Sequence, residues 1–304
     1  MTDTSRRTVL ASVAAVAAGL PTLNALVGDG ATPAAAADTF VSNTKLYSDG
    51  TYKEGVDWMR RYRIGAPVIT DNDRYASAPL NTTAVLAPHG GGIEAGTSEL
   101  CMAVAGYKPF DHGTDPSLAA EAGQVQRDFW MFEALANSAD QHVTSTHCDD
   151  PAALAVCAGN LYAVALHGFA GPERKVIIGG RDERFKRNLA ASFEKCGIGP
   201  STGNPDWNVT VVVAAPGDPI NGDDPANIVN RTRTGAGAQL EISTGLRQAM
   251  FGTFSGAENR RRTAGVPSAD SPSADRFWNG FVKAVRDAVR DHEAGRDPQY
   301  YPAP

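Results

Sequence analysis

The sequence predicts an α/β fold, built as a single-domain three-layer sandwich with a mixed, mostly parallel sheet and helices on both faces. Strand-like and helix-like segments alternate from Ala84 onward, which is typical of this class. Several strand-like segments are continuous runs of Val, Ile, Leu and Ala, as expected for strands that are covered on both sides. The 304 residues contain no internal repeat and no linker long enough to divide them, so we expect one domain.

The expected elements are short apolar runs and amphipathic segments. The strand-like segments are Thr83 to Ala87, Arg127 to Leu135, Gln141 to Thr146, Leu161 to Leu166, Lys175 to Gly179, Val209 to Ala215 and Ala238 to Ile242. The helix-like segments are Glu94 to Gly106, Arg181 to Lys195 and Ala274 to Glu293. Apolar residues recur at helical spacing in the last helix and predict a stripe that faces the core: Phe277, Phe281, Val285 and Val289.

The first 37 residues are expected to be a Tat-type export signal that is outside the fold. Arg6 and Arg7 precede a mildly apolar run from Ala11 to Val27, and three alanines then favour cleavage near Ala37. A membrane-spanning helix is disfavoured because the run is short and is interrupted by Gly19, Pro21 and Asn24. We therefore expect a secreted protein.

The mature chain is expected to consist of an N-terminal arm over residues 38–82, a main domain over 83–295 and a flexible tail over 296–304. The formal net charge of −6 argues against a nucleic-acid partner, which requires a basic surface. It leaves an anionic substrate possible in principle, because a local arginine cluster can attract one. We expect a monomer with no membrane span in the mature form.

The cysteines do not form a metal-binding pattern. None of the four makes a CxxC pair, so a cysteine zinc site is not expected. Disulfides and buried free thiols both remain open, and Cys148 and Cys157, which bracket a short segment, are the first candidates for a pair. The other two are Cys101 and Cys196.

Two strand-like segments end in His-Gly, and one of them is followed by a glutamate. His89 is separated from Glu94 by three glycines and Ile93, and His167 ends the segment that starts at Leu161. Ligands gather at the carboxyl ends of strands in α/β folds, and two imidazoles with one carboxylate suit a catalytic Zn²⁺ site. Taken singly, each residue has an ordinary explanation, as a surface or capping histidine or as a first-turn acid. Their combination favours zinc.

Glu241 stands between Leu240 and Ile242 in a strand that is expected to be buried. An isolated carboxylate there is costly, so we expect either a partner or a catalytic role. In a zinc hydrolase that role is the general base. A glutamate that points to solvent or pairs with an arginine is the alternative.

Further polar residues are candidates for substrate binding. Asn230, Arg231 and Arg233 could hold a carboxylate, although surface ion pairs are an alternative. His147 is a candidate substrate-binding or supporting residue, and Asp149 could orient a ligand imidazole. His142 is expected to be structural. Serine catalysis is disfavoured because no G-x-S-x-G sequence occurs.

At these residues the chain resembles the poly-γ-glutamate hydrolase family of phages and bacteria, which is related in fold to zinc carboxypeptidases. The matching segments, in the family's order, are Pro88-His89, Gly91 to Glu94, Gly96-Thr97, Glu99-Leu100, Val143 to His147, Asp149, His167-Gly168, Asn227 to Arg231 and Gln239 to Ser243. This chain departs from the family in its export signal, its longer arm and extra residues between Lys108 and Arg127.

The resemblance implies a zinc carboxypeptidase-like fold in which His89, Glu94 and His167 bind zinc and Glu241 is the catalytic carboxylate. It also implies hydrolysis of γ-glutamyl amide bonds in an anionic polymer or peptide, most simply poly-γ-glutamate, by metal-activated water. Two alternatives remain: a zinc amidase that acts on cell-wall peptides or small γ-glutamyl metabolites, and a non-catalytic metal- or polyanion-binding protein.

Overall fold

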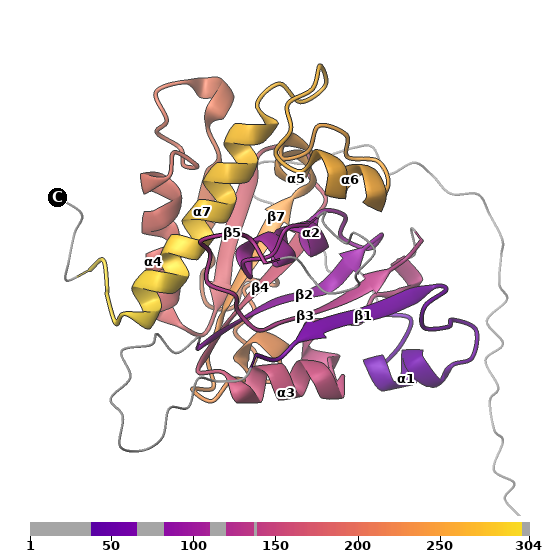
Figure 1. Ribbon diagram of the computed structural model, residues 1–304. Coiled ribbons are helices and arrows are strands. Elements are labelled where there is room, and N and C mark those ends of the chain that lie inside the picture. The colour runs from indigo at the N-terminus through magenta and orange to yellow at the C-terminus, as the bar shows by residue number, and fades with distance from the viewer. Residues whose placement is uncertain (1–37, 66–81, 110–119, 137–138, 300–304) are drawn as a thin grey trace, which may run out of the picture. The chain divides into compact units, whose positions relative to one another are not determined.

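The computed structural model describes residues 38–65, 82–109, 120–136 and 139–299 (Figure 1). The expected export signal over residues 1–37 lies outside this part of the chain, as do residues 66–81 of the expected arm and residues 300–304 of the expected tail. Within the described ranges, no helix combines the length and the apolar character that crossing a bilayer requires.

A mixed sheet forms the centre of the described residues, where it has seven strands in the order β1-β3-β2-β4-β7-β5-β6. The strands are β1 (Trp58–Arg63), β2 (Thr83–Gly91), β3 (Phe129–Ala134), β4 (Tyr162–Phe169), β5 (Lys175–Gly180), β6 (Thr210–Val213) and β7 (Ala238–Ser243). The central strands β3, β2, β4 and β7 run parallel to one another, whereas β1 and β5 are antiparallel to β3 and β7. The carboxyl ends of β2, β4 and β7 therefore lie at the same edge of the sheet.

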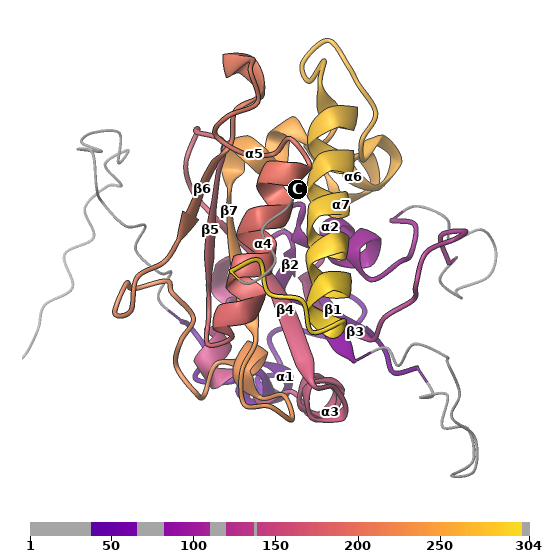
Figure 2. The same cartoon turned by 90° about the vertical axis from the view of Figure 1, so that its left-hand side faces the viewer.

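Helices cover both faces of this sheet (Figures 1 and 2). Val85 and Ala87 of β2 belong to the core that contains residues of α2, α4, α5 and α7, whereas Ala84 and Leu86 belong to the core under α1 and α3. Because successive strand residues alternate between faces, this double burial requires an apolar residue at every position. The helices are α1 (Asn43–Ser48), α2 (Thr97–Val104), α3 (Pro151–Gly159), α4 (Glu183–Lys195), α5 (Thr244–Ala249), α6 (Ala257–Thr263) and α7 (Ala274–Glu293).

The predicted α/β sandwich is confirmed, but one predicted strand is wrong. Residues 141–146 form no strand; the 3₁₀ turns η1 (Ala139–Gln141) and η2 (Ser145–His147) occupy this region. The physical reason lies in the hydrogen bonds: the backbone N–H of Thr144 and the ring of His142 bind the carboxylate of Asp38, where a strand would bind a neighbouring strand. Two further 3₁₀ turns are η3 (Pro205–Trp207) and η4 (Ile228–Asn230).

Several elements were not predicted individually. Helix α3 begins at Asp150-Pro151, where Asp150 accepts the backbone N–H of Ala153 and Pro151 occupies the first turn, a start signal that is visible in the sequence. Strand β1, inside the expected arm, forms the sheet edge beside β3. Helices α5 and α6 are each only about two turns long, and such short helices carry too little periodicity to be recognised.

The structure also describes the cysteines and the start of the tail. Cys148 and Cys157 do not form a disulfide, and all four cysteines are free thiols; burial raises the pKa of both the Cys148 and the Cys157 thiol. The tail is held at its start, because Asn188 of α4 donates a hydrogen bond to the carbonyl of Arg296 and Asp297 accepts two from Arg187.

Candidate metal centre and active site

Glycines at the end of β2 allow the chain to return toward His89. Gly91 has φ +67°, and a Cβ there would lie 2.1 Å from the carbonyl oxygen of Ala134, so a side chain could not be accommodated. The turn closes when the N–H of Glu94 donates to the carbonyl of His89 at 2.9 Å. The glycine turn therefore places the Glu94 side chain beside the imidazole that precedes it.

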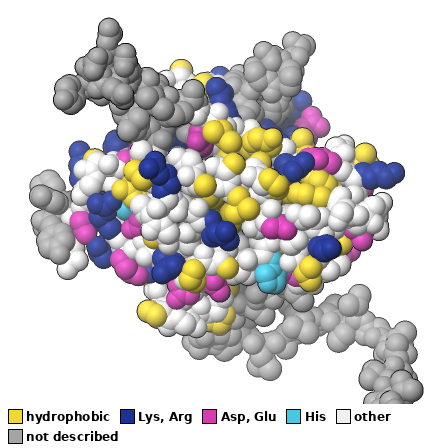
Figure 3. All heavy atoms as spheres, turned by 90° about the horizontal axis from the view of Figure 1, so that it is seen from below, with side chains coloured by type: hydrophobic (Ala, Val, Ile, Leu, Met, Phe, Trp, Pro, Cys, Tyr) yellow, Lys and Arg dark blue, Asp and Glu magenta, His cyan; other side chains and the backbone are white. Residues whose placement is uncertain are grey.

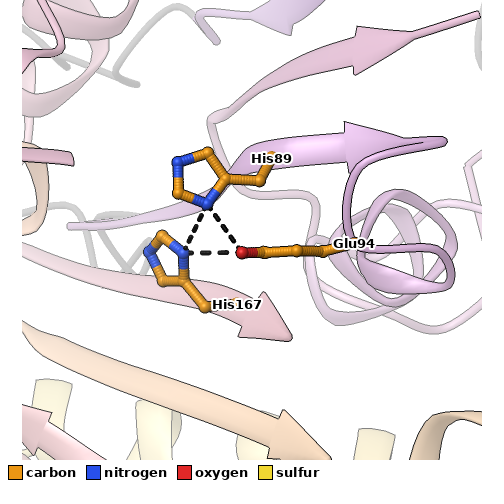
Figure 4. A group of neighbouring side chains, drawn as sticks. All are labelled: His89, Glu94 and His167. Atoms are coloured by element: carbon orange, nitrogen blue, oxygen red, sulfur yellow. Dashed lines mark hydrogen bonds and ion pairs between the residues drawn. The ribbon is translucent and has the colours of Figure 1, made fainter. Parts of the chain in front are cut away.

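His89, Glu94 and His167 form a compact cluster at the carboxyl ends of β2 and β4 (Figure 4). The two Nδ1 atoms of His89 and His167 lie 3.1 Å apart. Glu94 Oε1 is 2.8 Å from His89 Nδ1, and Glu94 Oε2 is 3.6 Å from His167 Nδ1. Both histidines are buried and Glu94 is partly buried. The sequence-predicted ligand set is thus brought together in space.

The spacing of these three groups fits a tetrahedral zinc site. Ligand atoms at about 2.0–2.2 Å from a tetrahedral zinc are separated from one another by about 3.3–3.6 Å. The two Nδ1 atoms are 3.1 Å apart, close to that range, and Glu94 faces both of them, with Oε1 at 2.8 Å from His89 Nδ1 and Oε2 at 3.6 Å from His167 Nδ1. Two imidazoles and a carboxylate are also the donor set of catalytic zinc, which uses three protein ligands and leaves one position open.

A hydrogen bond on the outer side of the His89 imidazole favours the protonation state that metal binding requires. His89 Nε2 donates to the carbonyl oxygen of Val143 at 2.9 Å, and His167 Nε2 lies 3.3 Å from Ser145 Oγ. A proton on Nε2 leaves the Nδ1 lone pair of a neutral imidazole free to face the centre of the cluster. Glu94 is oriented in the same way, because Oε2 accepts the backbone N–H of Gly168 at 2.9 Å.

Electrostatics hold the metal-free cluster as an ion pair. Burial opposes the charge of Glu94, but the charges and hydrogen bonds of His89 and His167 hold the pKa of Glu94 well below its ordinary value. Burial likewise opposes a charge on His89, yet the neighbouring Glu94 raises the pKa of His89 above its ordinary value. A proton between these groups occupies the place that a divalent cation would take.

Glu241 lies on β7 directly beside the cluster. It is the register partner of His167 on the adjacent parallel strand, and only 8% of the residue is exposed. Burial raises the pKa of Glu241 to about 7, against the opposing charge of His167. Gln239 donates to Glu241 Oε1 at 2.8 Å and in turn accepts from Asn227 at 3.0 Å. The carboxylate is therefore held in a fixed position by a hydrogen-bonded chain of amides.

Arg247 of α5 joins the three segments that carry the site, and the sequence analysis did not identify it. Its guanidinium donates to the carbonyl of Ala95 at 2.6 Å, to that of Ile242 at 3.1 Å and to that of Phe169 at 3.2 Å. Ala95 directly follows Glu94, and Ile242 directly follows Glu241. Phe169 lies two residues after His167. Arg247 thus links the chain on three sides of the cluster. In the sequence it is a single charged residue after Ser243-Thr244-Gly245-Leu246, and no motif identifies it.

Asn230 and Arg231, at the end of η4, differ in burial and in their contacts. Both amide protons of Asn230 are used within its own loop, on the carbonyls of Gly222 and Asp224, so this side chain shapes the loop. Arg231 is exposed, and its charge acts on the thiol of Cys157 in α3. Its contact with a substrate stays a prediction.

Among the residues around position 142, only Asp149 has contacts that differ from the sequence expectation. His142 was expected to be structural, and its ring packs 4.0 Å from the ring of His89. Burial lowers the pKa of His142 to about 4, so it packs there as a neutral ring. Asp149 does not orient an imidazole; it accepts the backbone N–H of Thr44 at the start of α1. His147 is exposed on η2 and lies 3.2 Å from Asp38.

Known proteins resemble this chain in both sequence and fold. The sequence matches the family described as poly-gamma-glutamate hydrolase over residues 71–112 and 110–270, which is more than half of the chain. It is 32% identical over 175 residues to the UPF0714 protein YndL of Bacillus subtilis (strain 168). That alignment covers 56% of this chain and 57% of YndL, so the chain matches little more than half of the length of this curated relative.

Two solved structures share the fold. A bacteriophage poly-gamma-glutamate hydrolase is similar with a TM-score of 0.62 and 23% identity, and the similarity covers 86% of this chain and 100% of that one. A zinc-free apo form of YndL is similar with a TM-score of 0.60 and 25% identity over 84% of this chain and 99% of that one. These similarities agree with the mixed sheet and two helical layers described above.

Proposed function

This chain belongs to the poly-γ-glutamate hydrolase family, and from that premise we propose that it is a zinc-dependent hydrolase of γ-glutamyl amide bonds whose substrate is poly-γ-glutamate. The observation that carries the proposal is the convergence of His89, Glu94 and His167 with Glu241 on the adjacent strand. The family match supports the reaction, and the zinc-free description of the YndL structure supports zinc as the metal.

Under this proposal His89, Glu94 and His167 hold the zinc. When bound, zinc supplies a Lewis acid that polarises an amide carbonyl and lowers the pKa of water. Glu241 takes a proton from the attacking water as the new C–O bond forms, and passes that proton to the amine nitrogen as the C–N bond breaks. Burial raises the pKa of Glu241 to about 7 in the metal-free protein, and this burial favours the protonated form that returns the proton to the amine.

Arg231 and His147 are the proposed contacts for the carboxylates of the substrate. Both are exposed, and they lie on or next to η4 and η2, which pack against each other. On the face shown in Figure 3, basic and acidic side chains of the described residues are interspersed. The net charge of −6 repels a polyanion as a whole. Its binding therefore depends on local basic groups such as Arg231.

We also propose that the chain acts outside the cell as a monomer after export by the Tat route. The support is the twin arginine Arg6-Arg7, the weak apolar run and the small residues that end at Ala37. N-terminal sequencing of the secreted protein should then begin at Asp38.

The experiment that tests the proposed activity compares two polymers of glutamate that differ in which carboxyl group forms the amide bond. The zinc-loaded protein is incubated with poly-γ-glutamate of known D/L composition and with poly-α-glutamate, and polymer length and new amines are measured. We expect only the γ-linked polymer to shorten, and a chelator to abolish the reaction. Cleavage restricted to cell-wall peptides or small γ-glutamyl compounds would replace the proposed substrate. Zinc binding without cleavage of any of these would contradict the enzymatic function.

A further inference from the structure

We propose that Asp38 is a positioning residue of the metal centre, because its carboxylate binds the peptide group that accepts the hydrogen bond from His89. The inference rests on the zinc site of the proposed function. It concerns a residue that lies about fifty positions from the nearest proposed ligand in the sequence and that touches no ligand itself.

Asp38 binds three residues of the segment from His142 to His147. Both of its carboxylate oxygens accept the backbone N–H of Thr144, at 2.9 and 3.0 Å. His142 Nδ1 donates to Oδ1 at 2.8 Å, and His147 Nδ1 lies 3.2 Å from Oδ2. Only 14% of the Asp38 side chain is exposed. A single, mostly buried carboxylate therefore fixes this segment at several points.

The peptide group between Val143 and Thr144 connects Asp38 to the metal centre. Its N–H is the one that Asp38 accepts, and its carbonyl oxygen accepts His89 Nε2–H at 2.9 Å. In a trans peptide these two groups point in opposite directions, so Asp38 and His89 lie on opposite sides of one planar unit. The result is a hydrogen-bonded chain that runs from carboxylate to peptide to imidazole and ends at the Nδ1 atom that faces Glu94.

Each bond in such a chain polarises the next. A carboxylate on the peptide N–H increases the negative charge on the carbonyl oxygen, which strengthens its hold on the imidazole N–H. An imidazole held in this way is a more basic and better oriented ligand, as it is when a carboxylate accepts its proton directly. Asp38 thus performs through one peptide group the role that a directly bonded carboxylate has in many zinc sites.

The same segment also contacts the second imidazole. Ser145 Oγ lies 3.3 Å from His167 Nε2, and the His142 ring packs 4.0 Å from that of His89. Loss of the Asp38 carboxylate would therefore loosen contacts to both histidines of the cluster. Asp38 is also the residue that follows the expected cleavage after Ala37, so the exported chain would begin at the residue on which this support depends.

The test measures the zinc affinity of the metal-free protein by competition with a chromophoric chelator. Asp38→Asn keeps the shape of the side chain but removes its charge and one acceptor. We expect the zinc Kd to rise about 10- to 100-fold, which is the usual cost of losing a hydrogen-bond partner of a metal ligand. Asp38→Glu retains the charge and should recover part of the affinity. The matched control is Asp149→Asn, which removes a carboxylate from the same region that binds only the start of α1; its Kd should stay within about twofold of the native value.

A second readout is the visible absorption spectrum of the cobalt-loaded protein, which should change in Asp38→Asn and remain native in Asp149→Asn, because it reports ligand geometry. An unchanged zinc Kd in Asp38→Asn, or an equal increase in both variants, would overturn the role of Asp38 even if the protein hydrolyses poly-γ-glutamate. A weaker Kd in a protein that cleaves no γ-linked substrate would support Asp38 and reject the proposed activity. A native protein that binds no zinc would overturn both.

Discussion

His167 and Glu241 are register partners on the parallel strands β4 and β7. Partners on adjacent strands lie about 4.8 Å apart and direct their side chains to the same side of the sheet. The proposed proton-transfer group is therefore placed next to a proposed metal ligand by the sheet itself. The amide of Gln239, two residues before Glu241 on the same face, then holds the carboxylate.

Replacement of Glu241 by Gln should separate proton transfer from metal binding. The substitution retains size and shape but removes the proton acceptor, so we expect kcat to fall by at least about 10²-fold, with zinc content unchanged. The measurement is the rate of amine release from poly-γ-glutamate together with metal analysis. Glu258→Gln, at an exposed glutamate, is the matched control and should retain the native rate. An active Glu241→Gln variant would refute the proposed proton transfer.

The same variant should change how stability depends on pH in the metal-free protein. The pKa of Glu241 is raised to about 7 by burial, compared with about 4.3 in an unfolded chain. Between these values the unfolded chain is ionised while the folded protein retains the proton, so the free energy of unfolding decreases as pH rises through this window. Gln cannot ionise and avoids this loss.

We therefore expect metal-free Glu241→Gln to be more stable than the native protein by on the order of 3–4 kcal/mol at pH 8, and by only about 1 kcal/mol at pH 5. Urea unfolding in the presence of a chelator at both pH values measures the difference. If the two proteins differ by the same amount at pH 5 and pH 8, Glu241 has no raised pKa.

Zinc should stabilise the folded protein through the His89, Glu94 and His167 cluster. At a free concentration of about 100 times Kd, binding adds about 2.7 kcal/mol, which corresponds to a rise in Tm of roughly 5–10 °C for a chain of this length. His89→Ala and His167→Ala should abolish the shift, and His147→Ala, at an exposed histidine outside the cluster, should retain it. A full shift in His167→Ala would show that another residue completes the site.

Arg247→Met should destabilise the protein and weaken zinc binding together. The substitution leaves the carbonyls of Ala95, Phe169 and Ile242 without their donor, and we expect a loss of roughly 3–5 kcal/mol in the free energy of unfolding. Arg290→Met removes an exposed arginine and should cost at most about 1 kcal/mol. Denaturant unfolding measures the free energy of unfolding of both variants. An equal loss in Arg247→Met and Arg290→Met would contradict the linking role of Arg247.

Arg231→Lys should raise KM for poly-γ-glutamate without changing zinc content or Tm. Lys keeps the charge but cannot form the two parallel hydrogen bonds that arginine makes with a carboxylate. Steady-state kinetics at several salt concentrations provide the measurement, and Arg290→Lys, at an exposed arginine of α7, is the comparison. The same KM in the native protein and in Arg231→Lys at every salt concentration would remove Arg231 from the binding site.

Much of the fold and the central cluster could be predicted from local sequence patterns. The runs that became β2 and β4 are apolar at successive positions because both faces of the sheet are covered there, whereas β7 alternates, with Ala238, Leu240 and Ile242 in the core. His89 and His167 could be identified because each stands at the end of such a run beside glycine, and Glu94 because a glycine turn returns it to His89. Such patterns depend on neighbours within a few residues, so the sequence by itself contains them.

The support of the site was decided only by the tertiary structure. Asp38 and Arg247 carry no pattern that marks them, since the contacts that join Asp38 to Thr144 and Arg247 to Ala95 span more than 100 positions of the sequence. The segment from 141 to 146 resembled a strand in the sequence, yet it lies in the fold where Asp38 takes its hydrogen bonds. The physical reason is the same in each case: a backbone N–H or carbonyl finds its partner only after the chain has folded, and sequence spacing does not specify which distant group arrives there.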